Sequence, residues 1–308
     1  PNSAGGGTHA LKMCANLATN NAGFGGVSVS PIGFSITENF EMRFDAWFNY
    51  NGPAPGGGSG STQVGGAGYG TAGTTAQVAG VADSVFIGGT ADGGSSADYR
   101  VYSPAHAISY QDGAFQIGSS GTDTTIKGDP NSGPVYAAED GTRNVVPGAT
   151  TGYYATNFPG QSAPAAQTAL FPQQTGTANN GALAFKWRDV VLRKVGNSIT
   201  YFVDGVLIAT VNVTDAGVLG GANILFNHYD INATASTDPN RTNLIFTLVD
   251  NVRVTEFTNV VSVTAPAANA SEAGPAPGTF TITRTSGGSP LTVFYTMTGS
   301  AGNGVDYV

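Results

Sequence analysis

The chain has 308 residues, of which 10% are charged and 45 are glycine; ordinary globular proteins carry roughly 25% charged residues. Its formal net charge of −8 argues against nucleic acid and anionic membranes as partners, because both attract basic surfaces. Aromatic residues make up 10% of the chain, so a packed core is expected. No apolar run approaches the length of a membrane span.

Two strands are predicted in the first 50 residues. The first lies in HALKMCANL, residues 9–17, and the second, stronger one is Ser35–Tyr50, SITENFEMRFDAWFNY. Side chains alternate along a strand, so one set should face the core and the other should form a polar face that carries one tryptophan. The expected core set is Phe40, Met42, Phe44, Ala46 and Phe48, and the expected polar set is Glu41, Arg43, Asp45, Trp47 and Asn49.

Long loops are expected in the next 130 residues. The low-complexity stretch 51–80 cannot bury much apolar surface and is predicted to be one loop. Short strands are predicted at Val81–Ile87 and Phe115–Gly118, and residues 119–180 read as loop punctuated by aromatic residues. A loop this long inside a domain is usually functional or packed by its own side chains.

The densest strand signal is Leu183–Val211. Leu183, Phe185 and Trp187 alternate with Ala184, Lys186 and Arg188. The turn signals Gly196-Asn197 and Asp204-Gly205 divide the stretch, which predicts a β-meander. Further strands are predicted at Ala222–His228, at Asn243–Phe257 and near 260–264, 278–285 and 291–297. No capped segment of helical period occurs, so the chain is predicted to be all-β.

Residues 8–257 resemble the LamG, or concanavalin A-like, jelly-roll domains of large secreted bacterial surface proteins. The resemblance is carried by HALKM, FEMRFDAWFNY, DGGSSADYRVYS, FKWRDVVLRK, ITYFVDGVLIAT and VDNVRV. It implies a two-sheet sandwich whose concave face binds glycans in many relatives.

Residues 260–308 resemble the first half of a Calx-beta module, through ASEAGP, GTFTITRT and LTVFYTMTGSAGNGVDY. Such modules are Ig-like β-sandwiches that are often repeated in surface proteins, and some bind calcium. About half of a module is present, so either the chain continues or another chain completes the open edge. The predicted domains are 1–258, a jelly roll, and 259–308, a partial Calx-beta-like sandwich.

Calcium is the expected cofactor, because hard cations take several oxygen ligands from acidic, glycine-rich loops. Asp92 and Asp98 form one candidate site, although such Asp-Gly sequences also simply make turns. Asp250, next to Asn251, is a second candidate. The Calx-beta resemblance implies Glu272 and Asp306 as ligands.

Glycan binding is the expected function of the polar face. Sugars bind exposed aromatic faces that have amides and carboxylates beside them. The predicted ligand-binding residues are Glu41, Arg43, Trp47, Asn49, Tyr99, Tyr153 and Tyr154. In the alternative reading, Trp47 and Trp187 are core residues or are covered by the long loops, because tryptophan is usually largely buried.

Catalysis is not expected. Glu41 and Asp45 share a strand face about 13 Å apart, whereas a glycosidase pair needs roughly 5 to 9.5 Å. Arg43 between them would keep both ionised. No G-x-S-x-G elbow occurs. Cys14 excludes an intramolecular disulfide, because it is the single cysteine; it is either inert packing or a crosslink between chains.

The sequence therefore predicts a non-catalytic extracellular module of a bacterial surface protein that binds glycan or mediates adhesion. One alternative is a structural subunit of a cell-surface filament or layer in which neighbouring copies exchange strands, since an unpaired strand edge is a template for strand addition. A homo-oligomer is possible in that case. A polysaccharide hydrolase or lyase is a further alternative.

Overall fold

The computed structural model describes residues 7, 9–15, 25–50, 52, 63–77, 82–91, 99–104, 107–112, 125–127, 135–137, 153–172, 174, 176–215, 217–230, 241–257, 261–267, 277–284 and 292–295. The chain divides into two compact units, Pro1–Phe257 (unit 1) and Thr258–Val308 (unit 2). The boundary predicted from the sequence lies one residue beyond this division.

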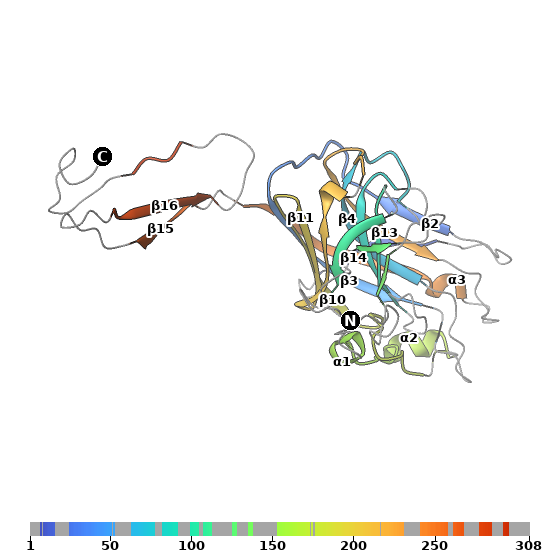
Figure 1. The fold of residues 1–308 in the computed structure, drawn as a ribbon. Helices are drawn as coiled ribbons and strands as arrows, with labels where there is room; N and C mark the ends of the chain where they lie inside the picture. The colour runs from blue at the N-terminus through green and yellow to red at the C-terminus, as the bar shows by residue number, and fades with distance from the viewer. Residues whose placement is uncertain are drawn as a thin grey trace. The chain divides into compact units, whose positions relative to one another are not determined.

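Unit 1 is a two-sheet antiparallel jelly-roll β-sandwich (Figure 1), so the predicted all-β fold class is confirmed. Sheet A has the strand order β1 (Leu11–Met13), β14 (Phe246–Glu256), β3 (Phe40–Asn49), β10 (Trp187–Val195), β11 (Ser198–Val203), β12 (Val206–Asn212), β7 (Ala107–Asp112), β8 (Thr125–Lys127). Sheet B has the order β2 (Gly25–Val29), β13 (Asn223–Asp230), β4 (Gln63–Thr71), β5 (Val85–Thr90), β6 (Tyr99–Tyr102), β9 (Val135–Ala137).

In the described part of the chain, short helices interrupt the strands at four places, although the sequence predicts none. They are α1 (Tyr153–Asn157), α2 (Ala165–Leu170), α3 (Arg241–Leu244) and the 3-10 turn η1 (Val213–Asp215). Each is shorter than two helical turns, so its sequence carries no detectable helical period. The predicted strand Phe115–Gly118 lies outside the described residues.

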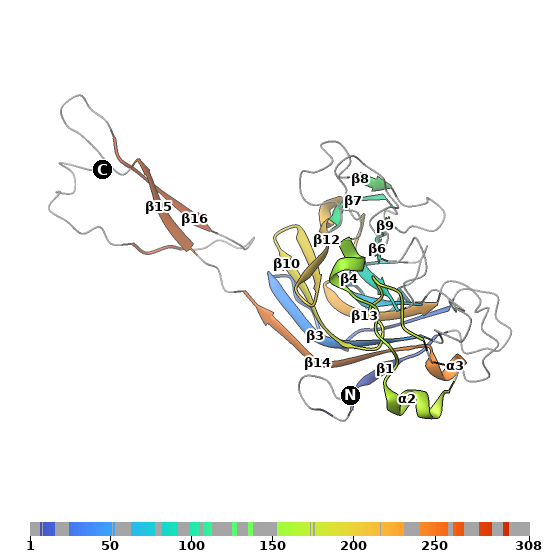
Figure 2. The same ribbon diagram turned by 90° about the horizontal axis from the view of Figure 1, so that it is seen from below.

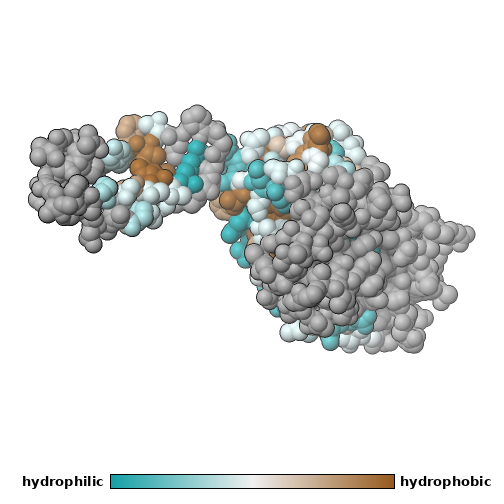
Figure 3. Space-filling view, in the orientation of Figure 1, coloured by the Kyte–Doolittle hydropathy of each residue, from teal (hydrophilic) through white to brown (hydrophobic). Residues whose placement is uncertain are grey.

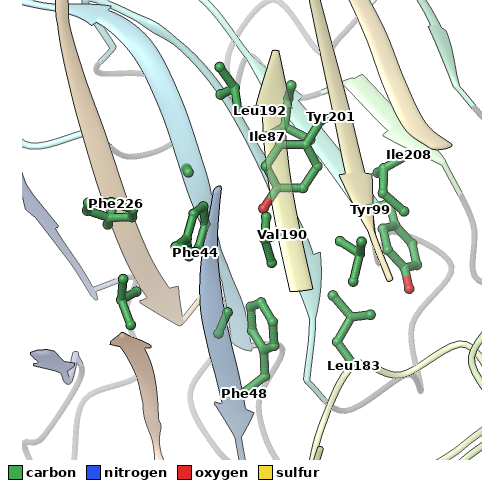
Figure 4. Close-up of a cluster of buried hydrophobic side chains, with 14 of the residues drawn as sticks. Phe44, Phe48, Ile87, Tyr99, Leu183, Val190, Leu192, Tyr201, Ile208 and Phe226 are labelled. Carbon is green, nitrogen blue, oxygen red and sulfur yellow. The ribbon is translucent and has the colours of Figure 1, made fainter. Parts of the chain in front are cut away.

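The core lies between the two sheets and is built largely on β3. Its predicted inner residues Phe40, Met42, Phe44, Ala46 and Phe48 are all buried. Phe44 meets Phe226 of sheet B edge to face, with ring centroids 5.0 Å apart (Figure 4). Burial of each such aromatic side chain contributes about 1.5–3 kcal/mol, so the alternation read from the sequence does specify the inner face of this strand.

The glycine-rich stretch 51–80 is not one loop, because residues 63–71 of it form the buried strand β4. Glycine is required there by close packing. A Cβ atom on Gly66 would lie 1.9 Å from the carbonyl oxygen of Ile87, and one on Gly65 would lie 2.5 Å from Thr247 Oγ1. The loop prediction was wrong for residues 63–71 because low apolar content does not exclude a buried strand. Atoms of the neighbouring strands pack directly against the glycine backbone there.

The meander β10–β11–β12 is confirmed, with the predicted turns between its strands. Gly196, Asp204 and Gly205 have positive φ angles of 56°, 51° and 77°, as tight hairpin turns require.

The alternation predicted at the start of the meander is wrong. Phe185 adopts φ 64° in a turn before β10, which breaks the period. Trp187 is therefore partly exposed, and Arg188 is the buried residue. Arg188 donates hydrogen bonds to Asp204 Oδ2 (2.9 Å) and to the carbonyl oxygen of Leu183 (3.1 Å), so its buried charge is paired.

Unit 2 contains the antiparallel pair β15 (Val261–Ala267) and β16 (Thr279–Arg284), at the first two strand positions predicted for it. Residues 292–295, within the third predicted strand, are not in a strand. Whether this unit is a Calx-beta module stays a prediction.

Candidate functional site

The outer face of sheet A carries a row of side chains that crosses four neighbouring strands. Lys12 of β1 is opposite Leu248 of β14, Leu248 is opposite Trp47 of β3, and Trp47 is opposite Trp187 of β10. Figure 2 shows β14, β3 and β10 side by side in this sheet. Adjacent strands lie about 4.8 Å apart, so the two tryptophans are direct neighbours, with ring centroids 5.9 Å apart.

A hollow of about 480 Å³, which we call the tryptophan groove, opens over this row. Segment 164–171 forms one wall, and the end of α3 with the first residues of β14 forms another. The lining is mostly apolar, with a few amides and one ammonium group; its residues are Lys12, Trp47, Pro164, Ala166, Gln167, Leu170, Phe171, Trp187, Asn243, Leu244, Phe246 and Leu248.

Helix α2, which forms part of one wall of the groove, buries little of its own surface. The sequence AAQTAL is rich in good helix formers, and the helix starts directly after Pro164. No residue of α2 is buried, and Leu170 is 73% exposed. A helix that buries so little of its own surface is held by few contacts.

Trp47 is only 4% exposed, so the expectation that it presents its ring on an open polar face is wrong. The alternative reading, in which Trp47 is a core residue or is covered by the long loops, agrees with its burial in the core cluster. Residues 164–171 of the predicted loop 119–180 line the groove together with it. Trp187 is the tryptophan of the groove with a partly exposed side chain.

A hydrogen-bonded chain of side-chain amides connects Trp47 to α2. Asn49 Oδ1 accepts from Trp47 Nε1 (3.2 Å) and from Gln167 Nε2 (3.0 Å), and Asn49 Nδ2 donates to the carbonyl oxygen of Leu244 (2.8 Å). Gln167 Nε2 also donates to Gln174 Oε1 (2.6 Å). Asn49 is therefore a buried structural partner of Trp47 and α2, and not an exposed ligand-binding amide as expected.

The predicted residues Glu41 and Arg43 lie further along β3, outside the lining of the groove. Arg43 binds both carboxylate oxygens of Asp189, at 2.6 and 2.7 Å. The hydrogen bonds that Arg43 donates to Asp189, together with the negative charge of that carboxylate, raise the pKa of the Arg43 guanidinium. Glu41 pairs with Arg193. Both pairs are on the exposed face, where an ion pair contributes about 0–1 kcal/mol.

The predicted aromatic rim is wrong for two of its residues. Tyr99 and Tyr154 are buried in the core, where their rings stack with centroids 3.9 Å apart. Tyr99 donates to the carbonyl oxygen of Gly181 (2.7 Å), and Tyr154 donates to that of Ile208 (3.1 Å). The side chain of Tyr153 lies outside the described residues.

A row of three aspartates crosses sheet A beside the tryptophan row. Asp45 is opposite Asp189 on one side and Asp250 on the other. A bulge in β14 follows Asp250, and Asn251 there has φ 51°. Asn251 donates its side-chain amide to Asp45 Oδ2 (2.7 Å) and its backbone N–H to Asp250 Oδ1 (2.8 Å).

Calcium binding at Asp250 stays a prediction. Calcium takes six to eight oxygen ligands, and no group of three or more His, Cys, Asp or Glu residues in the described part of the chain could hold a metal. The other predicted ligands, Asp92, Asp98, Glu272 and Asp306, lie outside the described residues. Calcium stays a prediction at those positions, to be checked by calorimetric titration with CaCl₂.

Sequence reasoning missed several groove residues. The sequence predicts Trp187 only as a member of an alternating set, and its place beside Trp47 depends on the register between β3 and β10. Gln167, Leu170 and Phe171 fell inside a predicted loop, although the helix-forming run AAQTAL could have predicted α2. Lys12, Phe246 and Leu248 carry no local signal, because nothing in the sequence pairs β1 or β14 with β3.

Comparisons with known proteins give no family. No family model matches the sequence, and no curated protein matches it. Among solved structures, the chain is similar to the carbohydrate binding module CBM66 from Bacillus subtilis, at 6% identity over 80% of this chain and 94% of that chain, with a TM-score of 0.30.

It is also similar to a protein described by the words "Prominent members of the human gut microbiota express endo-acting O-glycanases to initiate mucin breakdown", at 12% identity over 81% of this chain and 80% of that chain, with a TM-score of 0.33. Both TM-scores are too low to carry an argument about fold or ligand. Separately, no helix in the described part of the chain is long and apolar enough to cross a membrane.

Proposed function

We propose that unit 1 is a module that binds glycan without cleaving it. The observation that supports this proposal is the tryptophan groove, an open hollow of about 480 Å³ bordered by the amides of Gln167 and Asn243 and the ammonium group of Lys12. A sugar ring presents C–H groups on one face and hydroxyl groups around its edge. Such a ligand needs a flat apolar surface with a few polar groups beside it.

Trp187 is the residue on which the sugar stacks in this proposal. Trp187 is partly exposed and lines the groove, and Trp47 meets its ring edge to face from the neighbouring strand. Trp47 has its N–H bonded to Asn49, so it supports the ring of Trp187 instead of binding the ligand. In this proposal the sugar-stacking role predicted for Trp47 belongs to Trp187.

Native affinity electrophoresis in gels that contain hydroxyethylcellulose, xylan, galactomannan, levan or mucin tests this proposal. We expect retardation by at least one of these polysaccharides, and binding about tenfold weaker or more in Trp187→Ala, the loss typical of a central aromatic anchor. Val191→Ala, on the same face of β10 but outside the groove, is the matched control and should bind like the wild type.

Tryptophan fluorescence gives an independent measurement, because the chain has only two tryptophans and both line the groove. Titration with the retarding polysaccharide should change the emission of the wild type and of Val191→Ala. Retardation that persists undiminished in Trp187→Ala, or the absence of any retardation, would contradict the proposal.

Binding is favoured over catalysis by the position of the carboxylates. No aspartate or glutamate is among the described residues that line the groove. Asp45, Asp189 and Asp250 are neighbours across the strands, at the roughly 5 Å of a retaining glycosidase pair. However, none of the three lines the groove, and each is engaged by hydrogen bonds from Arg43 or Asn251. Release of reducing sugar that disappears in Asp45→Asn would support a hydrolase instead.

An extracellular, cell-surface location follows from this proposed ligand, since structural polysaccharides and mucins lie outside the cell. Adhesion is the corresponding role for a module of a surface protein. Labelling of intact cells by an antibody against unit 1 tests the location, and labelling only after lysis would contradict it.

A structural subunit that exchanges strands between copies is our second candidate, and the observation that favours it lies in unit 2. The side chains of the β15–β16 pair are exposed, including Val263 (59%), Phe280 (63%) and Ile282 (45%). Figure 3 shows hydrophobic residues on the surface of this unit. Light scattering should then report oligomers that Phe280→Ser reduces, and a strictly monomeric chain at high concentration would exclude this candidate.

A further inference from the structure

The amide of Gln167 has only one orientation that satisfies its neighbours. The indole N–H of Trp47 can only donate, so the atom of Asn49 that faces it, at 3.2 Å, must be the acceptor Oδ1. Gln174 faces the backbone carbonyl oxygens of Tyr50 (2.7 Å) and Gly52 (3.0 Å). Carbonyl oxygens can only accept, so Gln174 must present its Nε2 to them and its Oε1 to Gln167.

Gln167 therefore stands between two acceptors, Asn49 Oδ1 at 3.0 Å and Gln174 Oε1 at 2.6 Å. An amide NH₂ group has two hydrogens, and these two bonds use both of them. None of the described residues donates a hydrogen bond to the remaining atom, Gln167 Oε1. The side chain lines the tryptophan groove and is partly exposed.

We propose that Gln167 determines the specificity of the groove by presenting Oε1 as a fixed hydrogen-bond acceptor to the ligand that stacks on Trp187. This inference rests on the proposed glycan-binding function and narrows its ligand class. The ligand has to carry a hydroxyl or an amide N–H beside its apolar face. A group that only accepts, such as an ether, a carboxylate or a sulfate, is disfavoured there, because it would leave two acceptors facing each other.

The orientation is specified by groups that do not change with the ligand. An ordinary surface glutamine can rotate its amide by half a turn and offer either its oxygen or its nitrogen. Here such a rotation would place Oε1 against two acceptors and would lose two hydrogen bonds. The series of hydrogen bonds that fixes the Gln167 amide ends at an indole N–H and at backbone carbonyl oxygens, whose donor and acceptor roles cannot change. The groove therefore presents the same acceptor to every ligand.

The test compares Gln167→Met with the wild type on two probes. The probes are the polysaccharide that retards the wild type in the affinity gels and the same polysaccharide after O-methylation of its hydroxyl groups. Methionine has a similar length and helix propensity but no acceptor of comparable strength. We expect Gln167→Met to bind the native polysaccharide about three- to tenfold more weakly, the effect of one neutral hydrogen bond, and to bind the methylated form as the wild type does.

A purely structural role of Gln167, as the tether of α2, would weaken the binding of both probes to the same degree, and this result would overturn the inference. Unchanged binding of both probes would overturn it as well. Gln161→Met, a matched change outside the groove, should leave both affinities unaltered. A wild type that no polysaccharide in the panel retards would instead refute the proposed function itself, so the two failures are distinguishable.

Discussion

Strands β3 and β4 are both interior strands of their sheets, yet their sequences are opposite in character. β3 reads FEMRFDAWFN and builds the core from large alternating side chains, whereas β4 reads QVGGAGYGT and is buried over its whole length. β3 supplies volume to the core, and β4 supplies space for the side chains of its neighbours. An interior strand of a sandwich can therefore be built either from large side chains that fill the core or from glycines that leave room for the side chains of neighbouring strands.

The largest effect is expected for Gly66→Val in β4. Valine has high strand propensity and would be favoured in an exposed strand. Here its Cβ would lie 1.9 Å from a backbone oxygen of β5, so we expect a loss of about 5 kcal/mol or more, comparable with the whole stability of a domain. Circular dichroism should show no folded protein. Thr200→Val, on a partly exposed position of β11, is the control and should change stability by less than about 0.5 kcal/mol.

Phe44→Ala tests whether the large side chains of β3 are needed to fill the core. Its ring is fully buried against Phe226, so truncation leaves a cavity, and we expect a loss of about 3–5 kcal/mol. Urea unfolding measures it, with Phe44→Leu as the milder control. A loss below about 1 kcal/mol would mean that the sheets close the cavity by moving together.

His228 lies in β13, the neighbour of β4, and bonds to Thr247 in β14, the neighbour of β3; its burial makes stability depend on pH. Its Nδ1 lies 2.8 Å from Thr247 Oγ1, and in register His228 is opposite Gly65 of β4 while Thr247 is opposite Phe48 of β3. Complete burial lowers the pKa of His228 from 6.5 to about 3. Between these pH values the unfolded chain binds a proton that the folded chain does not.

The contribution of His228 to stability is therefore complete above about pH 6.5 and is lost as the pH falls toward 3. We expect it to remove roughly 3 kcal/mol between pH 6.5 and pH 4. Urea unfolding at several pH values should show a weaker pH dependence in His228→Gln, whereas His9→Gln, an exposed control, should keep the slope of the wild type. Equal slopes in all three proteins would contradict the assignment.

The smallest effect is expected on the outer face of β3. Arg43→Met removes the bidentate pair with Asp189, whose side chains are 57% and 36% exposed. Solvent screens this pair, so its loss should cost less than about 1 kcal/mol, and less still at high salt. A double-mutant cycle with Asp189→Asn measures it. A coupling energy well above about 1 kcal/mol between Arg43 and Asp189 would show that the charged outer face of β3 also stabilises the sandwich.

Much of sheet A was predictable because its determinants are local. Alternation gave the inner face of β3, and Asp204-Gly205 gave a hairpin whose positive φ angles the structure contains. β4 was missed because glycine supplies no signal of its own. The pattern at Trp187 was misread because a single turn at Phe185 shifts the alternation by one residue, and a one-residue shift moves every side chain to the other face.

Local patterns were enough to predict an all-β sandwich, the meander and the inner face of β3, because side-chain period and turn chemistry act between residues close in the chain. The residues that form the groove, in contrast, come together only in the folded sandwich. Lys12, Trp47, Trp187 and Leu248 meet through strand register, and Gln167 of α2 joins them through the packing of the chain. Pairing between distant strands depends on the packing of the whole sandwich, and no local pattern encodes it.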